Sequence, residues 1–410
     1  MAMRTDLNIE WRLRDGPWTP LEDLALRLRR SALGAVSIPA RATNSVGSGY
    51  VPGCEIGSGL DMNRVVAHWV NVPPLAPAAS LKSAGSVWSG RVVFIAGPWI
   101  MTLDARSDLL SLAPTLRSTA GLAMTHVAEL TKSDFGSFTG AEAAHVLFGL
   151  QTALSFAFGR WVAPALPVGF DHSGRRVWEQ WAPWRCDPFA GFLSWFDTGQ
   201  SADLQDFVAA FMTHWLDPSR SNAVRHLAQH AISAGQRRTT LEARIMLIQA
   251  ATEYLGWTNL VLSSRMTEQE YNSRSFPAAE KLRRLLEDAS IPTELPEDFS
   301  VLRSYSTTKA FKFDGPKTLT KVRNMLVHPK NAREPYELPG LLVEAWLLSM
   351  RYGNQLLLHH IGYTGTFQLN SPNGGWAHTS TRVPWATPVK RTKARPIPRS
   401  ARAPRRVGKS

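Results

Sequence analysis

Cysteine is nearly absent from this sequence, which excludes several kinds of site. Only Cys54 and Cys186 occur in 410 residues, far apart and in no paired-ligand spacing. Neither a disulfide framework nor a cysteine zinc site is therefore expected. We interpret the two residues as ordinary thiols of a reduced, cytoplasmic protein, and we expect neither a cofactor nor a bound metal.

Long hydrophobic runs without charge are also lacking. The most hydrophobic stretch, residues 338–361, contains Glu344 and Arg351 together with amides and two histidines, which a membrane-spanning helix would place in hydrocarbon. Residues 1–14 alternate charged with apolar side chains and have no signal-peptide core. We therefore expect neither a membrane span nor secretion, and we predict a buried helix at 338–361.

Acidic residues are missing from the C-terminal tail. The whole chain has a net charge of +13, but nine basic and no acidic residues lie between Lys390 and Lys409, so the rest is only mildly basic. Three prolines interrupt any helix there. We predict residues 389–410 to be a disordered basic tail, which either contacts phosphates without reading sequence or simply keeps the chain soluble.

Several catalytic and phosphate-binding patterns are present only in part. The glycine-rich runs at 47–49 and 57–59 lack the lysine and the following helix of a phosphate-binding loop. Asp171, His172 and Ser173 have the residue types of a catalytic triad, but neighbours in a turn point in different directions. We interpret these three residues as the turn of a β-hairpin.

Two further patterns have a structural explanation that is preferred over a functional one. His226 and His230 have the spacing of a helical zinc pair, but no glutamate lies between them, so a polar helix face is favoured. Four tryptophans could stack nucleic-acid bases, although packing in a core or an interface is the more common role. They are Trp178, Trp181, Trp184 and Trp195.

The first half of the chain, residues 1–202, is predicted to be a β-rich, mostly antiparallel domain. Dense glycine and proline residues separate short runs of valine, isoleucine and tryptophan. One helix, at 140–158, should pack across a face of the sheet. Strands are expected at 65–72, 91–95, 99–103 and 122–129, with a hairpin joining 166–170 to 176–181.

The second half is predicted to be helical, which makes the fold class α+β. A connector at 203–236, broken at Asp217-Pro218, leads into a bundle at 237–363, and a short cap at 364–388 precedes the tail. Four main helices in this length are typical of an antiparallel bundle. They are two long helices from about 241 and 341, a shorter one at 276–289, and one near 316–328.

The most informative pattern is the heptapeptide Arg323-Asn324-Met325-Leu326-Val327-His328-Pro329. It combines a cation for phosphate, an amide for orientation and a histidine that can exchange protons near neutrality. Its Arg-x4-His spacing is expected about once by chance in this composition, and Arg225 with His230 repeats it. The residues around the motif therefore have to decide whether it marks a functional site.

The helix that carries the heptapeptide has clear expected ends. Asp314-Gly315-Pro316 predicts a start near Pro316, and Pro329 predicts an end at or just before His328. The histidine would then lie at the negative end of the helix dipole, which favours imidazolium. Asn324 shares a face with His328 and could orient its ring, whereas Arg323 projects about 140° away, so the arginine must bend or a dimer must form.

In this context, Arg-Asn-x-Leu-Val-His-Pro resembles the HEPN superfamily (higher eukaryotes and prokaryotes nucleotide-binding) over about residues 238–363. The resemblance implies a four-helix bundle that dimerises and forms one metal-independent ribonuclease site from both subunits. It implies that Arg323 binds the phosphate, Asn324 is the polar residue after the arginine, and His328 is the acid–base group. The β-rich half resembles the sensor-type domain of ApeA-like phage-defence proteins.

Two hypotheses follow from this resemblance. The first is an RNA endonuclease that leaves a 2′,3′-cyclic phosphate and acts in anti-phage defence or toxin-like growth arrest. It would have RNA and a second copy of itself as partners, with an unknown trigger at the N-terminal domain. The second is a non-catalytic binding or dimerisation module that contacts nucleic acid or protein, because a fold does not determine a function.

Overall fold

The computed structural model describes most of the chain between residues 54 and 386. The described residues are 54–57, 61–76, 86–190, 193–308, 314–331, 333–369, 371–373 and 380–386, together with strand backbones at 6–10, 24–26, 36–38, 40–43, 46–50 and 79–83. The predicted tail at 389–410, with its proposed phosphate contacts, lies outside the described residues. Of the glycine-rich run at 57–59, the structure describes only Gly57.

The N-terminal half contains a large antiparallel sheet of eight strands in the order β6-β13-β12-β7-β11-β10-β9-β8. The four predicted strands and the predicted hairpin are confirmed. The strands are β6 (Cys54–Ile56), β7 (Arg64–Val70), β8 (Ala79–Ser83), β9 (Ser86–Ala96), β10 (Trp99–Ala105), β11 (Met124–Lys132), β12 (Ala163–Phe170) and β13 (Arg176–Trp181).

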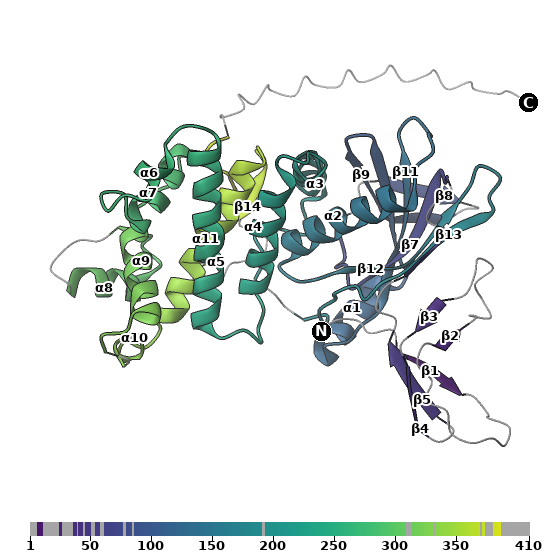
Figure 1. The fold of residues 1–410 in the computed structure, drawn as a ribbon, viewed down its shortest axis with the longest axis horizontal. Helices are drawn as coiled ribbons and strands as arrows, with labels where there is room; N and C mark the ends of the chain where they lie inside the picture. The colour runs from purple at the N-terminus through teal and green to yellow at the C-terminus, as the bar shows by residue number, and fades with distance from the viewer. Residues whose placement is uncertain are drawn as a thin grey trace, which may run out of the picture.

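Further strands pair separately from this sheet near the start of the chain (Figure 1). The strand β5 (Val46–Tyr50) lies between β1 (Asp6–Glu10) and β4 (Ala40–Thr43), and both pairings are antiparallel. A two-stranded pair joins β2 (Leu24–Leu26) to β3 (Val36–Ile38). Together with the large sheet, these pairings confirm that the N-terminal half is β-rich and antiparallel.

One face of the large sheet is buried by helices. Along β10 the side chains of Trp99, Met101 and Leu103 are buried and those between them are half-buried, because successive residues of a strand point to opposite faces. The buried face packs against α2 (Gly140–Phe158), which crosses the sheet as predicted (Figure 1). The helix α3 (Ser201–Trp215) covers β9.

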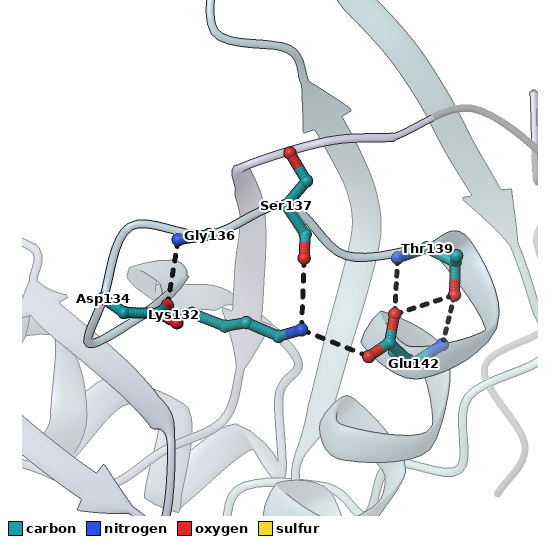
Figure 2. Close-up of polar contacts among 6 residues, drawn as sticks. All are labelled: Lys132, Asp134, Gly136, Ser137, Thr139 and Glu142. Atoms are coloured by element: carbon teal, nitrogen blue, oxygen red, sulfur yellow. Dashed lines mark hydrogen bonds and ion pairs between the residues drawn. The ribbon is translucent and has the colours of Figure 1, made fainter.

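The first turn of α2 is fixed by a capping box. The Thr139 hydroxyl accepts from the backbone N–H of Glu142 at 3.2 Å, and the Glu142 carboxylate accepts from the backbone N–H of Thr139 at 2.8 Å (Figure 2). Lys132, at the end of β11, donates to the other oxygen of Glu142 and to the Ser137 carbonyl. Two otherwise unpaired N–H groups are satisfied, and the helix start is tied to the sheet.

A second helix in this half, α1 (Leu109–Thr119), was not expected from the sequence. Pro114 lies inside it, and proline removes one backbone donor and normally interrupts a helix. Only Leu109, Ala113 and Leu116 are buried, so the apolar stripe is short. The prediction of a single helix among the strands was therefore wrong.

Two helices connect the sheet with the rest of the chain. They are α3 (Ser201–Trp215), whose buried Phe207, Phe211 and Trp215 form the predicted stripe, and α4 (Ser221–Ala234). The predicted break at Asp217-Pro218 is confirmed. Both connector helices contact α2, and α4 also packs against two helices of the C-terminal half, so one hydrophobic core extends through both halves.

The C-terminal half is helical. The four predicted main helices are confirmed as α5 (Leu241–Trp257), α7 (Ala278–Asp288), α9 (Gly315–Val327) and α11 (Leu341–His360), and they pack against one another. Shorter elements join them: the π-helical turn η1 (Thr258–Leu262), α6 (Glu268–Tyr271), α8 (Ser300–Thr308) and α10 (Glu334–Glu337). No helix among the described residues is long and apolar enough to cross a membrane.

The buried side chain of Glu344 explains how α8 attaches to α11. Its two carboxylate oxygens accept from the backbone N–H groups of Val301 and Leu302, at 3.2 and 2.9 Å. These donors belong to the first turn of α8 and would otherwise be unpaired.

After α11, the strands β14 (Thr366–Gln368) and β15 (Ser380–Arg382) pair with each other and return to the connector. There the backbone N–H of Thr366 donates to the Asp203 carboxylate of α3.

Candidate functional site

Helix α9 places the heptapeptide at its C-terminal end. The Asp314 carboxylate caps the start by accepting from the backbone N–H of Lys317 at 2.9 Å, and Pro316 lies in the first turn. Val327 is the last helical residue and His328 is the C-cap, since the following Pro329 disfavours helical geometry for it. Both expected ends of the helix are confirmed.

The start of α9 is also held by a charged contact with α7. Arg283 donates from Nε to the second oxygen of Asp314 at 2.7 Å, and it pairs with Glu280 of its own helix. Hydrogen bonds to these two carboxylates raise the pKa of Arg283. Asp314 therefore caps α9 with one oxygen and fixes it to α7 with the other.

The buried face of α9 orients the motif outward. Leu319, Val322 and Met325 are buried, and the Nε2 of Gln249 in α5 donates to the Leu319 carbonyl at 3.2 Å. The Tyr305 hydroxyl of α8 contacts the Met325 sulfur at 3.4 Å. With this face fixed, Arg323 is half-buried, while Asn324 and His328 are exposed.

The arginine side chain bends toward the face of the amide. Nη1 of Arg323 donates to the Asn324 side-chain oxygen at 3.2 Å. Since Asn324 and His328 lie four residues apart on one face, the guanidinium is drawn toward the histidine side of the helix. Arg323 thus contacts the residue that shares a face with His328, and the approach of both side chains to one phosphate stays a prediction.

The amide does not orient the imidazole in this chain. The Asn324 side-chain oxygen is occupied by Arg323, and Asn324 meets His328 only through its backbone carbonyl, which accepts the His328 backbone N–H at 2.8 Å. The expectation that Asn324 orients the His328 ring was therefore wrong for the isolated subunit. The exposed ring is free to be positioned by something else.

The charged side chains of α9 itself are all positive. Helix α9 carries Lys317, Lys321 and Arg323 and no acidic side chain, and none of these cations pairs with a carboxylate among the described residues. An arginine without a carboxylate keeps its planar donors available for a phosphate. The two lysines on α9 were not singled out from the sequence, although a helix with cations alone is the pattern that could have found them.

The second Arg-x4-His pair lies in a different environment. Arg225 is exposed on α4 and donates to Asn222 at 3.1 Å, whereas the rings of His226 and His230 lie against each other at a tilt of 32°, with centroids 4.0 Å apart. Burial, with the charges of His230 and Arg225, lowers the pKa of His226. No group of three or more potential metal ligands occurs in the part of the chain that the structure describes.

The triad-like turn, two of the four tryptophans and Cys186 have structural roles. Asp171 forms a turn in which its Oδ1 accepts from Ser173, and His172 points to Asn63 and Ser137, so no triad forms. Trp178 and Trp195 are fully buried, which confirms core packing for both. Cys186 is buried, and burial raises the pKa of its thiol to about 12.

Two stretches of the chain match models of known protein families. Residues 57–192, which contain β7 to β13, match the YopA central domain, and residues 217–378, which contain the motif, match the YopA C-terminal domain. No solved structure matches.

The chain is also similar to the SPbeta prophage-derived uncharacterized protein YopA of Bacillus subtilis (strain 168). The two are 25% identical over 282 residues, which is 68% of this chain and 62% of that protein. The chain thus spans less than two thirds of the length of this relative. Its sheet region and its helical region are each similar to a separate YopA domain.

Proposed function

We propose that this chain is a metal-independent endoribonuclease of the HEPN type. In this proposal α5, α7, α9 and α11 are the four-helix bundle, and Arg323, Asn324 and His328 are the site. The observation that carries it is Arg323, a half-buried cation that bonds to the Asn324 amide and pairs with no described carboxylate, five residues before an exposed histidine. Such a group is available to a phosphodiester.

The proposed chemistry is transfer of the phosphate to the neighbouring ribose oxygen. His328 accepts the proton of the 2′-OH, the 2′ oxygen bonds to phosphorus, and the bond from phosphorus to the 5′ oxygen breaks. Arg323 stabilises the negative charge of the phosphorane. The leaving 5′ oxygen takes a proton from His328 of the partner subunit, so the products are a 2′,3′-cyclic phosphate and a 5′-OH.

A second subunit is part of the proposal because the chemistry needs both an acid and a base. Exposed apolar side chains on the helices flanking the motif support such a contact. Val327 lies within the motif, directly before His328, and Tyr336 is anchored to α5 through a 2.8 Å hydrogen bond to Glu242. Met246 on α5 and Val343 on α11 are exposed as well.

RNA is the proposed substrate. The unpaired cations Lys317, Lys321 and Arg323 attract a phosphate backbone, and the mechanism requires the 2′-OH that DNA lacks. We propose a role in conflict between phage and host, as phage defence or growth arrest; the relative in Bacillus subtilis is prophage-derived. In this role the β-rich half would receive the trigger.

The test is incubation of the purified full chain with total RNA in the presence of EDTA. We expect cleavage with cyclic-phosphate ends, and a loss of about 10²-fold or more in His328→Ala and in Arg323→Ala. Arg225→Ala is the matched control, since it removes an exposed arginine with the same Arg-x4-His spacing. Titrating His328→Ala into the wild type should reduce activity beyond dilution if the site is shared between subunits.

The competing hypothesis predicts a different result. A binding or dimerisation module would bind RNA or its partner without cutting it, and both motif variants would behave as the wild type. Full activity in His328→Ala would eliminate the ribonuclease proposal, whereas EDTA-sensitive cleavage would eliminate its metal independence.

A further inference from the structure

A cavity of about 430 Å³ lies where the two halves of the chain meet. Its walls come from α2, the segment after β13, α4 and α5, represented by Gln151, Trp184, His230 and Leu247. The volume falls within the range of sites for small molecules, and such sites commonly form where domains meet. It is separate from the motif, none of whose residues lines it.

The walls of the cavity include three large aromatic side chains. Trp184 and Trp161 are almost fully buried, and Phe148 is half-buried. Trp184 belongs to the tryptophan cluster for which base stacking was the alternative to core packing. Unlike Trp178 and Trp195, it borders a space large enough for a ring, and aromatic faces bind planar rings by stacking.

A cation lies at the rim of the same cavity. Arg185 is exposed, its guanidinium lies 4.9 Å from the centre of the Trp161 ring, and its backbone carbonyl accepts from the buried Gln151 amide at 2.9 Å. No acidic residue is among the described residues that line the cavity. The guanidinium is therefore held by an aromatic ring and keeps its donors for an anion.

Helix α4 contributes further polar groups. Nδ1 of His230 lies 2.8 Å from the His226 carbonyl and donates to it, so Nε2 is the ring nitrogen left for a ligand. The His226 ring, whose centroid lies 4.0 Å away, limits rotation of this imidazole. Gln229 and Ser233 line the cavity from the same helix. Aromatic walls, the Arg185 guanidinium and several polar groups form a combined recognition surface.

We propose that this cavity binds a small planar aromatic anion of the nucleoside monophosphate class. The base lies against Trp184 and Phe148, the phosphate is bound by Arg185, and His230 offers Nε2 to a polar group of the ligand. The proposal does not depend on ribonuclease activity, because none of its residues belongs to the motif.

The test is calorimetric titration of the full chain with AMP, GMP, CMP and UMP, using adenosine and inorganic phosphate as probes for each half of the ligand. We expect saturable binding of at least one nucleotide, with adenosine and phosphate each weaker. Arg185→Gln should weaken nucleotide binding by about tenfold or more and leave adenosine binding unchanged. The intrinsic tryptophan fluorescence should change on binding and saturate at the same concentration.

Arg225→Gln is the matched control, because it removes the same charge from an exposed position on α4 outside the cavity. Trp184→Phe keeps a ring and should retain more binding than Trp184→Leu, provided that both melt cooperatively. Failure of all four nucleotides to bind would overturn the proposal. It would also be overturned by phosphate binding as tightly as the nucleotide, or by equal effects of Arg185→Gln and Arg225→Gln.

Discussion

The guanidinium of Arg323 donates to the side-chain amide oxygen of Asn324 at 3.2 Å, so two neighbouring motif residues act as one polar unit. The contact joins the half-buried Arg323 to Asn324, which lies on the same exposed face of α9 as His328. The contact has a direct consequence for substitutions at Asn324. A carboxylate at this position, which has the same size as the amide but a negative charge, would neutralise Arg323.

We expect Asn324→Asp to impair phosphate binding more than Asn324→Ala. The aspartate would pair with Arg323 and neutralise it, whereas alanine leaves the arginine free but less oriented. The measurement is RNA affinity over a range of salt concentrations. A loss of one phosphate contact reduces the slope of log affinity against log salt by about 0.7 to 1. Asn324→Asp with an unchanged slope would contradict the idea that Arg323 contacts phosphate.

Asp314 should matter to stability more than its position at a helix start suggests. Asp314→Ala removes both the cap of α9 and the contact with Arg283, and we expect the free energy of unfolding to fall by about 2 kcal/mol. Asp314→Asn keeps an oxygen for the cap and loses the charge, so its effect should be about half as large. Urea denaturation measures both, and equal effects would show that the contact with Arg283 contributes little.

Two glycines with the same backbone conformation allow packing to be separated from strain. Gly159 (φ +65°) ends α2 and Gly362 (φ +73°) follows α11, but a Cβ at Gly159 would lie 2.1 Å from the Leu193 carbonyl oxygen, whereas nothing lies within 4 Å at Gly362.

We expect Gly362→Ala to cost about 1 kcal/mol from backbone strain alone, and Gly159→Ala to cost about 3 kcal/mol or more. Thermal unfolding of the two variants checks this prediction. Similar melting temperatures would show that the segment around Leu193 yields to the added methyl group.

We expect acid to lower the free energy of unfolding at pH values where most carboxylates are still charged. Burial lowers the pKa of His126 to about 4, and burial together with His214, His359 and Arg220 lowers the pKa of His360 to about 4. Both are neutral in the folded protein, whereas the unfolded chain binds protons near pH 6.5.

The free energy of unfolding should therefore fall between about pH 6.5 and pH 4, by about 2–3 kcal/mol for each histidine. Urea titrations of the wild type across this range, compared with His360→Gln, measure the effect. The variant should show a shallower dependence on pH. An unchanged dependence would assign the acid sensitivity to other groups.

The sequence predicted elements that carry their own end signals. Helix α2 begins at Gly140 because Thr139 and Glu142 form a capping box, and α9 begins and ends as Asp314, Pro316 and Pro329 indicate. Helix α1 could not be predicted, since its Pro114 opposes a helix and only tertiary packing overrides that preference.

The side-chain geometry of the site was less accessible. The heptapeptide and its resemblance to a known family gave Arg323, Asn324 and His328 as candidates, but the choice of the Asn324 amide between Arg323 and His328 depends on rotamers. The cavity was missed entirely, although Trp184 and His230 had both been considered. Its lining residues come from segments far apart in the chain, and only the fold brings them together.

The shared hydrophobic core makes the sheet and the helical half parts of one packed unit. Buried side chains from Met62 in the sheet region to Val383 after the last helix belong to one cluster, and the Trp346 indole of α11 donates to the Ala234 carbonyl at the end of α4. Helix α4 contacts both α2, which covers the sheet, and α5 and α11 of the helical half, so it is the direct packing route from the sheet to the helices that hold α9.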